Sequence, residues 1–249
     1  MHKYKISIIT VVKNGMPYLK DSIKSFDTQS LDNKEHIIVY SPSTDNTENY
    51  LQNYQDSKKI IKDDISQNKF GSINIGVEKA QGEYIGLLHA DDILPNSNTL
   101  AEIYDFIKNT KSDLIYGNIK FSKKKNINKI IRYWKSNPFD KSQLKYGWMP
   151  PHTSIYGKSD IIKKIKYSEK FPISGDYKFI LELFNNNNLK KTYLNKTLCI
   201  MRSGGDSTKV SQLFKKLTED LKIAKIYFNS NLLCIASKIL RKINQFRIL

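Results

Sequence analysis

The first third of the chain alternates short apolar runs, the first of them rich in β-branched residues, with segments of helical periodicity. The runs predict strands at Lys5–Val12, Glu35–Tyr40, Ile60–Lys62 and Tyr84–Leu88. Between them, apolar side chains recur every three or four residues, which is the spacing of an amphipathic helix. Strands joined by helices in this order pair in parallel, with helices on both faces of the sheet. The chain is therefore predicted to adopt an α/β fold with a mostly parallel sheet.

The rest of the 249-residue chain continues this pattern at a length that suits one large domain. Helices are predicted around Leu100–Ile107 and Tyr177–Phe184, and strands at Asp113–Tyr116 and Thr192–Met201. Between these elements, the segment Ser122–Tyr146 is rich in Lys and Asn and shows no clear periodicity. We interpret that segment as a surface excursion.

Polar residues follow three of the predicted strands. They are Asn14, the turn Ser41–Asp45, and the pair Asp91 and Asp92. In a parallel sheet, ligands bind in the crevice outside the carboxyl ends of the strands. We therefore expect these three segments to meet at one crevice although they are far apart in the sequence.

The acidic pair closes the apolar stretch GLLHADDILP (residues 86–95). Two adjacent carboxylates at a strand end repel each other and lose hydration there. A cation beside them removes both problems, and carboxylate ligands suit Mg²⁺ or Mn²⁺. The alternative is a turn in which Asp91 and Asp92 cap the local backbone.

The composition narrows the classes of partner. The net charge is +17, but the basic residues are mostly scattered lysines and arginine is scarce. Base recognition usually relies on arginine, so nucleic acid is not expected as a partner. Cys199 and Cys234 stand in apolar surroundings and match no metal spacing, which favours buried free thiols and a cytoplasmic location. No run approaches the roughly 18 apolar residues of a membrane span.

Several motifs occur in an order that resembles one enzyme family. They are SIITVVKN (7–14), EHIIVYSPSTDNT (35–47), NIGVEKAQGEYIGLLHADD (74–92), ISGDYKFILEL (173–183) and RSGGDS (202–207). Together they resemble the inverting family 2 glycosyltransferases with the GT-A fold, in particular bacterial enzymes that build capsule, colanic-acid and O-antigen polysaccharides. The resemblance covers about the first 210 residues.

The resemblance implies a fold, a reaction and its participants. The fold would be a Rossmann-like GT-A domain with helices on both faces of the sheet. The reaction would transfer a sugar, with inversion, from a nucleotide-sugar donor to a hydroxyl of a saccharide acceptor, in the biosynthesis of a bacterial surface polysaccharide such as lipopolysaccharide or capsule. A UDP-sugar is favoured as the donor, with GDP- and dTDP-sugars as alternatives. The acceptor would be lipid-linked, and the cofactor would be Mn²⁺ or Mg²⁺.

The resemblance also implies roles for individual residues. Asp176 would be the catalytic base and Asp91 the metal ligand. The expected donor contacts are Thr10, Val12, Asn14, Tyr40, Asn74, His89 and Asp92. The residues expected at the acceptor or in a lid are His152, Arg202, Gly204 and Gly205. The alternative role for Asp176 is purely structural, as the cap of the following helix, and capping is compatible with catalysis. The preceding Gly175 is expected to leave room for a close acceptor.

Three positions depart from the family pattern. His89 stands where the family has an acid, and its neutral imidazole could ligate Mn²⁺ or hydrogen-bond the donor. Tyr40 replaces the Asp that contacts the base, where an aromatic ring could stack on it. Gly71 replaces a further polar residue. A nucleotide- or saccharide-binding relative without catalytic activity is therefore the alternative function.

The C-terminal tail is both basic and apolar. We place the glycosyltransferase domain at residues 1–209 and a basic, amphipathic helical extension at residues 210–249. Within NLLCIASKILRKINQFRIL (231–249), leucines and isoleucines form a broad apolar face with Lys and Arg among them. Such a helix can pack on the core, on a second subunit in a homodimer, or on an anionic membrane on the cytoplasmic face of the inner membrane. We favour packing slightly over membrane contact.

Overall fold

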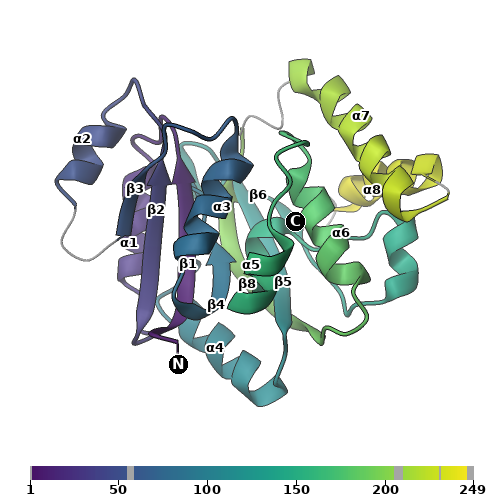
Figure 1. The fold of residues 1–249 in the computed structure, drawn as a ribbon, viewed down its shortest axis with the longest axis horizontal. Helices are drawn as coiled ribbons and strands as arrows, with labels where there is room; N and C mark the ends of the chain where they lie inside the picture. The colour runs from purple at the N-terminus through teal and green to yellow at the C-terminus, as the bar shows by residue number, and fades with distance from the viewer. Residues whose placement is uncertain (1, 55–58, 205–209, 230, 246–249) are drawn as a thin grey trace.

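A computed structural model describes residues 2–54, 59–204, 210–229 and 231–245. Within this part of the chain, eight strands form one sheet in the order β3-β2-β1-β4-β7-β5-β6, with β8 paired to β5 (Figure 1). The strands are β1 (Tyr4–Val12), β2 (Lys34–Tyr40), β3 (Lys59–Lys62), β4 (Gly82–Leu87), β5 (Leu114–Lys123), β6 (Asn126–Trp134), β7 (Tyr156–Lys158) and β8 (Lys191–Arg202). The four strands predicted in the first third of the chain are confirmed.

The sheet is parallel where the first four strands pair and mixed beyond them. β1 pairs in parallel with β2 and β4, so that Ile9 lies beside both Ile37 and Leu87. β7 is antiparallel to β4 and β5, and β8 is parallel to β5. The mostly parallel sheet expected from the sequence is therefore present.

Helices cover both faces of this sheet. The helices are α1 (Leu19–Asp27), α2 (Thr47–Gln52), α3 (Lys69–Lys79), α4 (Thr99–Thr110), α5 (Ser159–Ile165), α6 (Gly175–Asn185), α7 (Val210–Tyr227) and α8 (Asn231–Asn244), with 3-10 turns η1 (Lys141–Tyr146) and η2 (His152–Ser154). Side chains of β1 alternate between two cores: Ile6 and Ile8 pack with α1 and α4, whereas Ile9 packs with α3 and α6. This alternation follows from the two-residue period of a strand.

The segment 122–146, interpreted as a surface excursion without clear periodicity, contains a regular strand that the sequence did not predict. β5 runs on to Lys123 and forms a hairpin with β6, in which Ile119 pairs with Trp134. β6 is the last strand on its side of the sheet, and its first half alternates exposed Asn and Lys with half-buried residues. An edge strand protected by charged side chains lacks the apolar run that identifies a buried strand.

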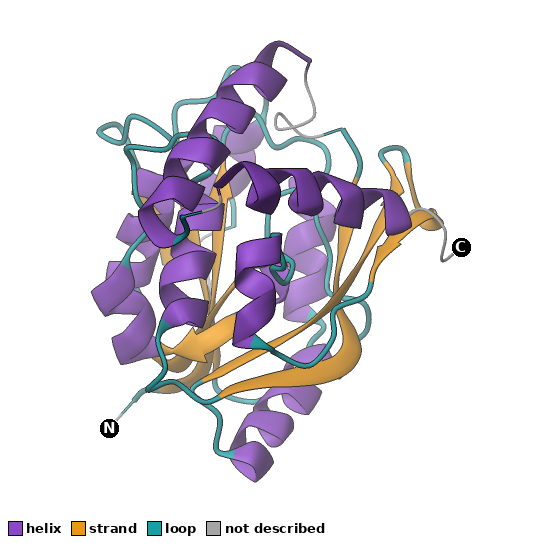
Figure 2. Ribbon diagram, turned by 90° about the vertical axis from the view of Figure 1, so that its right-hand side faces the viewer, coloured by secondary structure: helices purple, strands orange, loops and turns teal. Residues whose placement is uncertain are grey.

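The C-terminal helices α7 and α8 pack against the domain, beside α6 and η1 (Figures 1 and 2). Ile223, Ala224, Cys234 and Ile235 are buried in the same core as α3 and α6. A buried ion pair of 2.9 Å joins Lys238 on α8 to Asp220 on α7. One face of each helix is thus part of the main core, as the packing interpretation expected.

The described helices include none with the length and apolar content needed to cross a bilayer.

Stability should show that α7 belongs to the core. Ile223 is fully buried, so Ile223→Ala should lower the free energy of unfolding by about 2–5 kcal/mol through lost contacts and a cavity. Ile226, on the same helix, is 61% exposed, so Ile226→Ala should change it by less than about 0.5 kcal/mol. Urea unfolding monitored by circular dichroism measures both. Equal effects of the two substitutions would contradict the packing of α7.

Candidate functional site

The loops after β1 and β2 are joined at the carboxyl edge of the sheet. Asn14 adopts a left-handed conformation, with φ of 52°, which asparagine tolerates better than most residues. Its side-chain oxygen accepts a hydrogen bond of 2.7 Å from the backbone N–H of Thr44, and its own N–H donates to Ser43 Oγ. Asp45 accepts a hydrogen bond from the Met16 N–H at 2.9 Å. The expected convergence of these two strand ends is present.

The loop after β4 adds the acidic pair and His89. One ligand atom from each of His89, Asp91 and Asp92 lies within 4.8 Å of the others. Asp92 is buried, and its Oδ1 accepts a hydrogen bond of 3.2 Å from the Arg202 N–H. Burial raises the pKa of the Asp92 carboxyl well above its usual value, and the negative charge of Asp91 raises it further. This is the like-charge conflict that the sequence indicated.

A divalent cation fits this group of residues. The two carboxylates supply the hard oxygen ligands that Mg²⁺ and Mn²⁺ prefer, and an imidazole suits Mn²⁺ better than Mg²⁺. A positive charge there would favour the ionised form of Asp92 and remove its repulsion with Asp91. Asp91 is only half-buried, so its carboxylate can meet a cation that arrives from the crevice.

A second histidine faces the first across the site. The rings of His89 and His152 are 6.1 Å apart, and His152 Nε2 lies 2.8 Å from the Tyr167 hydroxyl. Burial lowers the pKa of His89, and burial lowers that of His152 to about 3. Both imidazoles are therefore neutral near pH 7 and can accept a hydrogen bond or ligate a metal through an unprotonated nitrogen.

Asn74 positions this histidine indirectly. Its side chain accepts a hydrogen bond of 2.7 Å from the Tyr167 N–H and donates one of 2.8 Å to the Tyr167 carbonyl. The Tyr167 ring stacks on Phe179 with centroids 3.9 Å apart. Donor contact by Asn74 stays a prediction, since both polar groups of its side chain already bind the backbone.

Asp176 lies at the start of α6 on the same side of the molecule as the histidines. Burial acts to raise its pKa, but nearby positive charges, with Lys216 of α7 the strongest, outweigh burial and lower that pKa to about 2. The negative charge of Asp176 in turn acts on the pKa of both His89 and His152, which places the three groups within electrostatic reach of one another. The His152 ring also lies 6.4 Å from that of Phe179, three residues after Asp176 on α6, so the histidines pack beside the start of this helix. The role of Asp176 as the base stays a prediction.

The segment before Asp176 is held from α7. Glu219 accepts hydrogen bonds of 3.0 and 2.8 Å from the backbone N–H groups of Ile173 and Ser174. These N–H groups lie at the N-terminal end of α6, where helix donors lack partners within the helix. The N-cap of α6 is Ser174, and Asp176 Oδ1 accepts a hydrogen bond of 2.8 Å from the Tyr177 N–H, so the Asp176 carboxylate is fixed at the start of the helix.

Gly175 does not leave room for an acceptor. A methyl group at this position would lie 2.7 Å from the Phe70 ring and 2.8 Å from the Ser168 carbonyl oxygen. The glycine instead allows α6 to approach α3 closely.

Arg202 is bound within the protein. Its guanidinium donates to Asp21 Oδ2 at 2.5 Å and to the Lys124 carbonyl oxygen at 3.0 Å, and it lies over the Tyr18 ring. Its Nε is buried without a hydrogen-bond partner among the described residues. Gly204 is exposed with φ of +97°, and Gly205 lies outside the described residues. Acceptor or lid roles for these positions stay predictions.

The remaining donor positions occupy the end of the sheet. Thr10 is buried and donates a hydrogen bond of 2.8 Å to the Leu88 carbonyl oxygen, and Val12 is buried in an apolar cluster against α1. Any donor contact from Val12 would have to come from its backbone. Tyr40 is half-buried at the last position of β2, and its donor contact stays a prediction.

The space at Gly71 is filled by other residues. A methyl group there would lie 2.7 Å from both Glu169 Oε2 and Ser66 Oγ. Where α3 lacks a polar side chain, the space is therefore filled in part by the Glu169 carboxylate, which comes from the segment before α6. Sequence spacing could not indicate this contact.

Several residues of the site escaped the sequence analysis for a common reason. Tyr167, Glu169, Lys216 and Glu219 lie far from the strand ends in sequence and carry no motif. Asp63 could have been found from the sequence, because it directly follows β3 and is an acid at a strand end. Its carboxylate, however, is occupied by Ser72 and by the N–H groups of Ile65 and Ser66.

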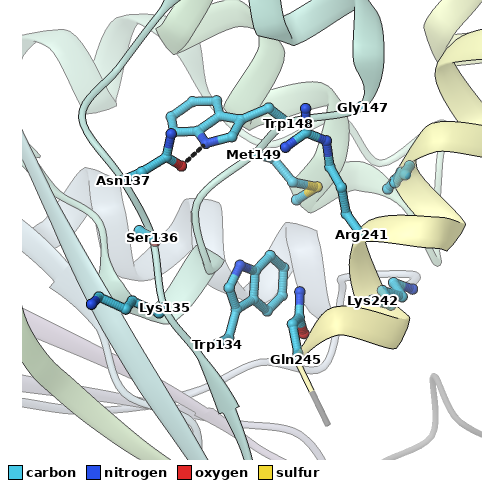
Figure 3. Close-up of a pocket in the computed structure, with 11 residues that line it drawn as sticks. Trp134, Lys135, Ser136, Asn137, Gly147, Trp148, Met149, Arg241, Lys242 and Gln245 are labelled. Carbon is cyan, nitrogen blue, oxygen red and sulfur yellow. Dashed lines mark hydrogen bonds between the residues drawn. The ribbon is translucent and has the colours of Figure 1, made fainter. Parts of the chain in front are cut away.

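A cavity of about 180 Å³ lies elsewhere, between α8 and the segment after β6 (Figure 3). Trp134, Trp148 and Met149 line it together with Arg241 and Gln245, and the Trp148 indole donates to Asn137 Oδ1. It shares no residue with the acidic cluster. The candidate site is therefore the strand-end cluster and not this cavity.

Comparison with known proteins gives consistent similarities. A family model described as glycosyl transferase family 2 matches residues 7–166. An uncharacterized glycosyltransferase of Haemophilus influenzae is 28% identical over 237 residues, which cover 94% of this chain and 92% of the relative.

Solved structures share the fold. S. aureus TarS 1–349 in complex with UDP-GlcNAc gives a TM-score of 0.72 at 18% identity, covering 97% of this chain and 72% of that one. The mannosyltransferase PcManGT of Pyrobaculum calidifontis, in complex with GDP-Man and Mn²⁺, gives a TM-score of 0.62 at 11% identity, with coverage of 97% and 74%. These likenesses confirm the GT-A fold expected from the sequence motifs.

The acidic cluster leads to a metal-binding prediction. Asp91→Asn removes a charged ligand while keeping the shape of the side chain, so Mn²⁺-dependent binding of a nucleoside diphosphate should weaken by at least about 100-fold, the upper range for loss of a supporting residue. Asp64→Asn is the matched control, because Asp64 is an exposed acid paired with Lys62. Isothermal titration with and without EDTA measures the difference. If neither EDTA nor the Asp91 substitution changed the nucleotide affinity, the result would contradict a metal at this position.

Proposed function

The chain belongs to glycosyl transferase family 2, and from this membership we propose that it transfers a sugar from a nucleotide-sugar donor to a saccharide hydroxyl with inversion. The observation that carries the proposal is the meeting of Asp176 with the acidic strand end and the two histidines. A reaction of this type needs a carboxylate to accept the acceptor's proton and a separate polar site for the leaving diphosphate. Asp176 would meet the first need, and the acidic strand end with a bound cation would meet the second.

Asp176 is the proposed general base. Its pKa of about 2 keeps the carboxylate ionised at neutral pH, so it is ready to accept a proton. The low pKa also makes it a weak base, and its contribution must come largely from position. Glu219 helps to fix that position, because it accepts hydrogen bonds from the backbone just before α6.

The acidic strand end is the proposed diphosphate site. When bound there, Mn²⁺ or Mg²⁺ would neutralise the charge that develops on the leaving group. Asp91 would be the accessible ligand, Asp92 the buried one, and neutral His89 would replace the acid usual in the family. The structural neighbours solved with UDP-GlcNAc, or with GDP-Man and Mn²⁺, support a nucleotide-sugar donor but leave the nucleotide open.

The acceptor is proposed to be a lipid-linked saccharide on the cytoplasmic side of a membrane, in the assembly of a surface polysaccharide. This part rests on the motif resemblance alone. The competing function, binding without catalysis, is favoured by the departures at Tyr40 and Gly71. Transfer or hydrolysis of a panel of UDP-, GDP- and dTDP-sugars with Mn²⁺ separates the two. Nucleotide binding with no turnover on any donor would favour the non-catalytic relative.

Asp176→Asn should separate catalysis from binding. The amide cannot accept the acceptor's proton, so kcat should fall by about 10²–10⁴-fold, the usual contribution of a general base. Nucleotide affinity in the presence of Mn²⁺ should stay near wild type, in contrast to Asp91→Asn. Steady-state transfer assays and titrations on the same protein test both parts. Transfer at near wild-type rate by Asp176→Asn would mean that another carboxylate is the base.

The pH profile follows from the same group. A lowered pKa means that the reactive carboxylate is present above that pKa and is lost only as the pH falls through about 2. Asp176 should therefore impose no acidic limb on kcat near neutral pH.

Tyr40 is proposed to stack on the nucleobase. Base stacking on aromatic side chains is worth about 1–3 kcal/mol in nucleic-acid sites, so Tyr40→Ala should weaken nucleotide binding by about 5- to 150-fold. Tyr40→Phe keeps the ring and should bind almost as well as wild type. Equal binding by the alanine and phenylalanine variants would remove Tyr40 from the donor site.

A further inference from the structure

The exposed face of α8 is apolar. Leu233, Ile239, Leu240 and Ile243 are 50–62% exposed, and with the exposed Ala236 they fall within about a third of the helix circumference. We call these five residues the outer face of α8. In Figure 2, α8 crosses the front of the molecule, and no other element is drawn in front of it.

The polar residues of α8 point the other way. Lys238 pairs with Asp220 at 2.9 Å, and Arg241 donates to the Tyr146 carbonyl at 2.9 Å. Figure 3 shows Arg241 of α8, and Gln245 just after this helix, beside the tryptophans of the cavity. A surface helix normally buries its apolar stripe and exposes its charges. In α8, Lys238 and Arg241 bind the protein, whereas the five apolar residues of the outer face meet the surroundings.

The adjacent helix α7 adds more apolar surface and positive charge. Leu213 and Phe214 in its first turns are 61% and 83% exposed. Lys215, Lys222 and Lys225 are exposed as well, whereas the acids of this helix, Glu219 and Asp220, are buried and paired. The described part of α7 and α8 therefore presents apolar side chains and lysines to its surroundings but no exposed acid.

We propose that the outer face of α8 docks on an anionic lipid membrane, with the lysines of α7 beside it facing lipid headgroups. An apolar helical face flanked by cations is the pattern of a helix that lies in the membrane interface. A second copy of the chain is a poorer occupant, because each copy carries a net charge of +17 and would bring exposed lysines against lysines.

The docking surface is connected to the candidate site. Lys216 of α7 lowers the pKa of Asp176, and Glu219 holds the backbone before α6. A membrane bound by α8 would thus lie on the side of the molecule that supports the proposed base. This placement of a lipid-linked acceptor rests on the proposed function, whereas the membrane contact itself does not.

Vesicle co-sedimentation tests the surface. Wild type should pellet with vesicles of phosphatidylcholine and phosphatidylglycerol, much less with phosphatidylcholine alone, and less again at high salt. The double substitution Ile239→Ser, Leu240→Ser should reduce binding by about tenfold or more, because it removes buried apolar area. The control is Ile65→Ser, since Ile65 is 90% exposed in a loop far from α8 in sequence.

Two further measurements make the test decisive. Thermal unfolding and nucleotide affinity of the double variant should match wild type, so a failure of membrane binding is distinguished from a failure of the fold or of the proposed reaction. Lys222→Glu, Lys225→Glu should weaken binding to anionic vesicles only. Wild-type protein that stays in the supernatant, or a double variant that binds as wild type does, would overturn the proposal. So would a wild-type dimer in size-exclusion chromatography that the double variant converts to monomer.

Discussion

Parallel pairing of β1 with β2 and β4 is the constraint on which the site depends. The shared register ends the three strands at one edge, so the loops that carry Asn14, Asp45 and Asp91 must meet there. Some polar groups of these loops then form hydrogen bonds with one another, whereas the carboxylates of Asp91 and Asp92 repel each other. A parallel sheet with both faces covered by helices leaves this edge as the natural place for a charged ligand.

The second half of the chain supplies what the strand ends lack. α6 brings Asp176, η2 brings His152, and α7 brings the charge of Lys216 and the carboxylate of Glu219. These elements are held by buried contacts such as the Tyr167–Phe179 stack and the Lys238–Asp220 pair. The C-terminal helices are therefore part of the support for the proposed base, even though one face of α8 is left apolar and exposed.

Sequence reasoning succeeded where a single local pattern sufficed. Short apolar runs located β1 to β4, and the polar residues after them located the crevice. It failed where the pattern was weak, as in β6, whose edge position allows exposed Asn and Lys in place of an apolar run. It also misread Gly175, because a glycine shows only that space is needed and not whether the protein or a ligand occupies it.

The sequence by itself determined the α/β order of elements, the acidic strand end and the motif similarity to glycosyltransferases. Each of these depends only on residues that are neighbours in the chain. Only the tertiary structure decided which groups surround Asp176, that Glu169 fills the space at Gly71, and that Lys238 and Arg241 of α8 bind within the protein. Those facts depend on contacts between segments that are separated in the sequence, such as Gly71 and Glu169. Periodicity shows that a helix has an apolar face, but the surface available for packing decides whether that face is buried.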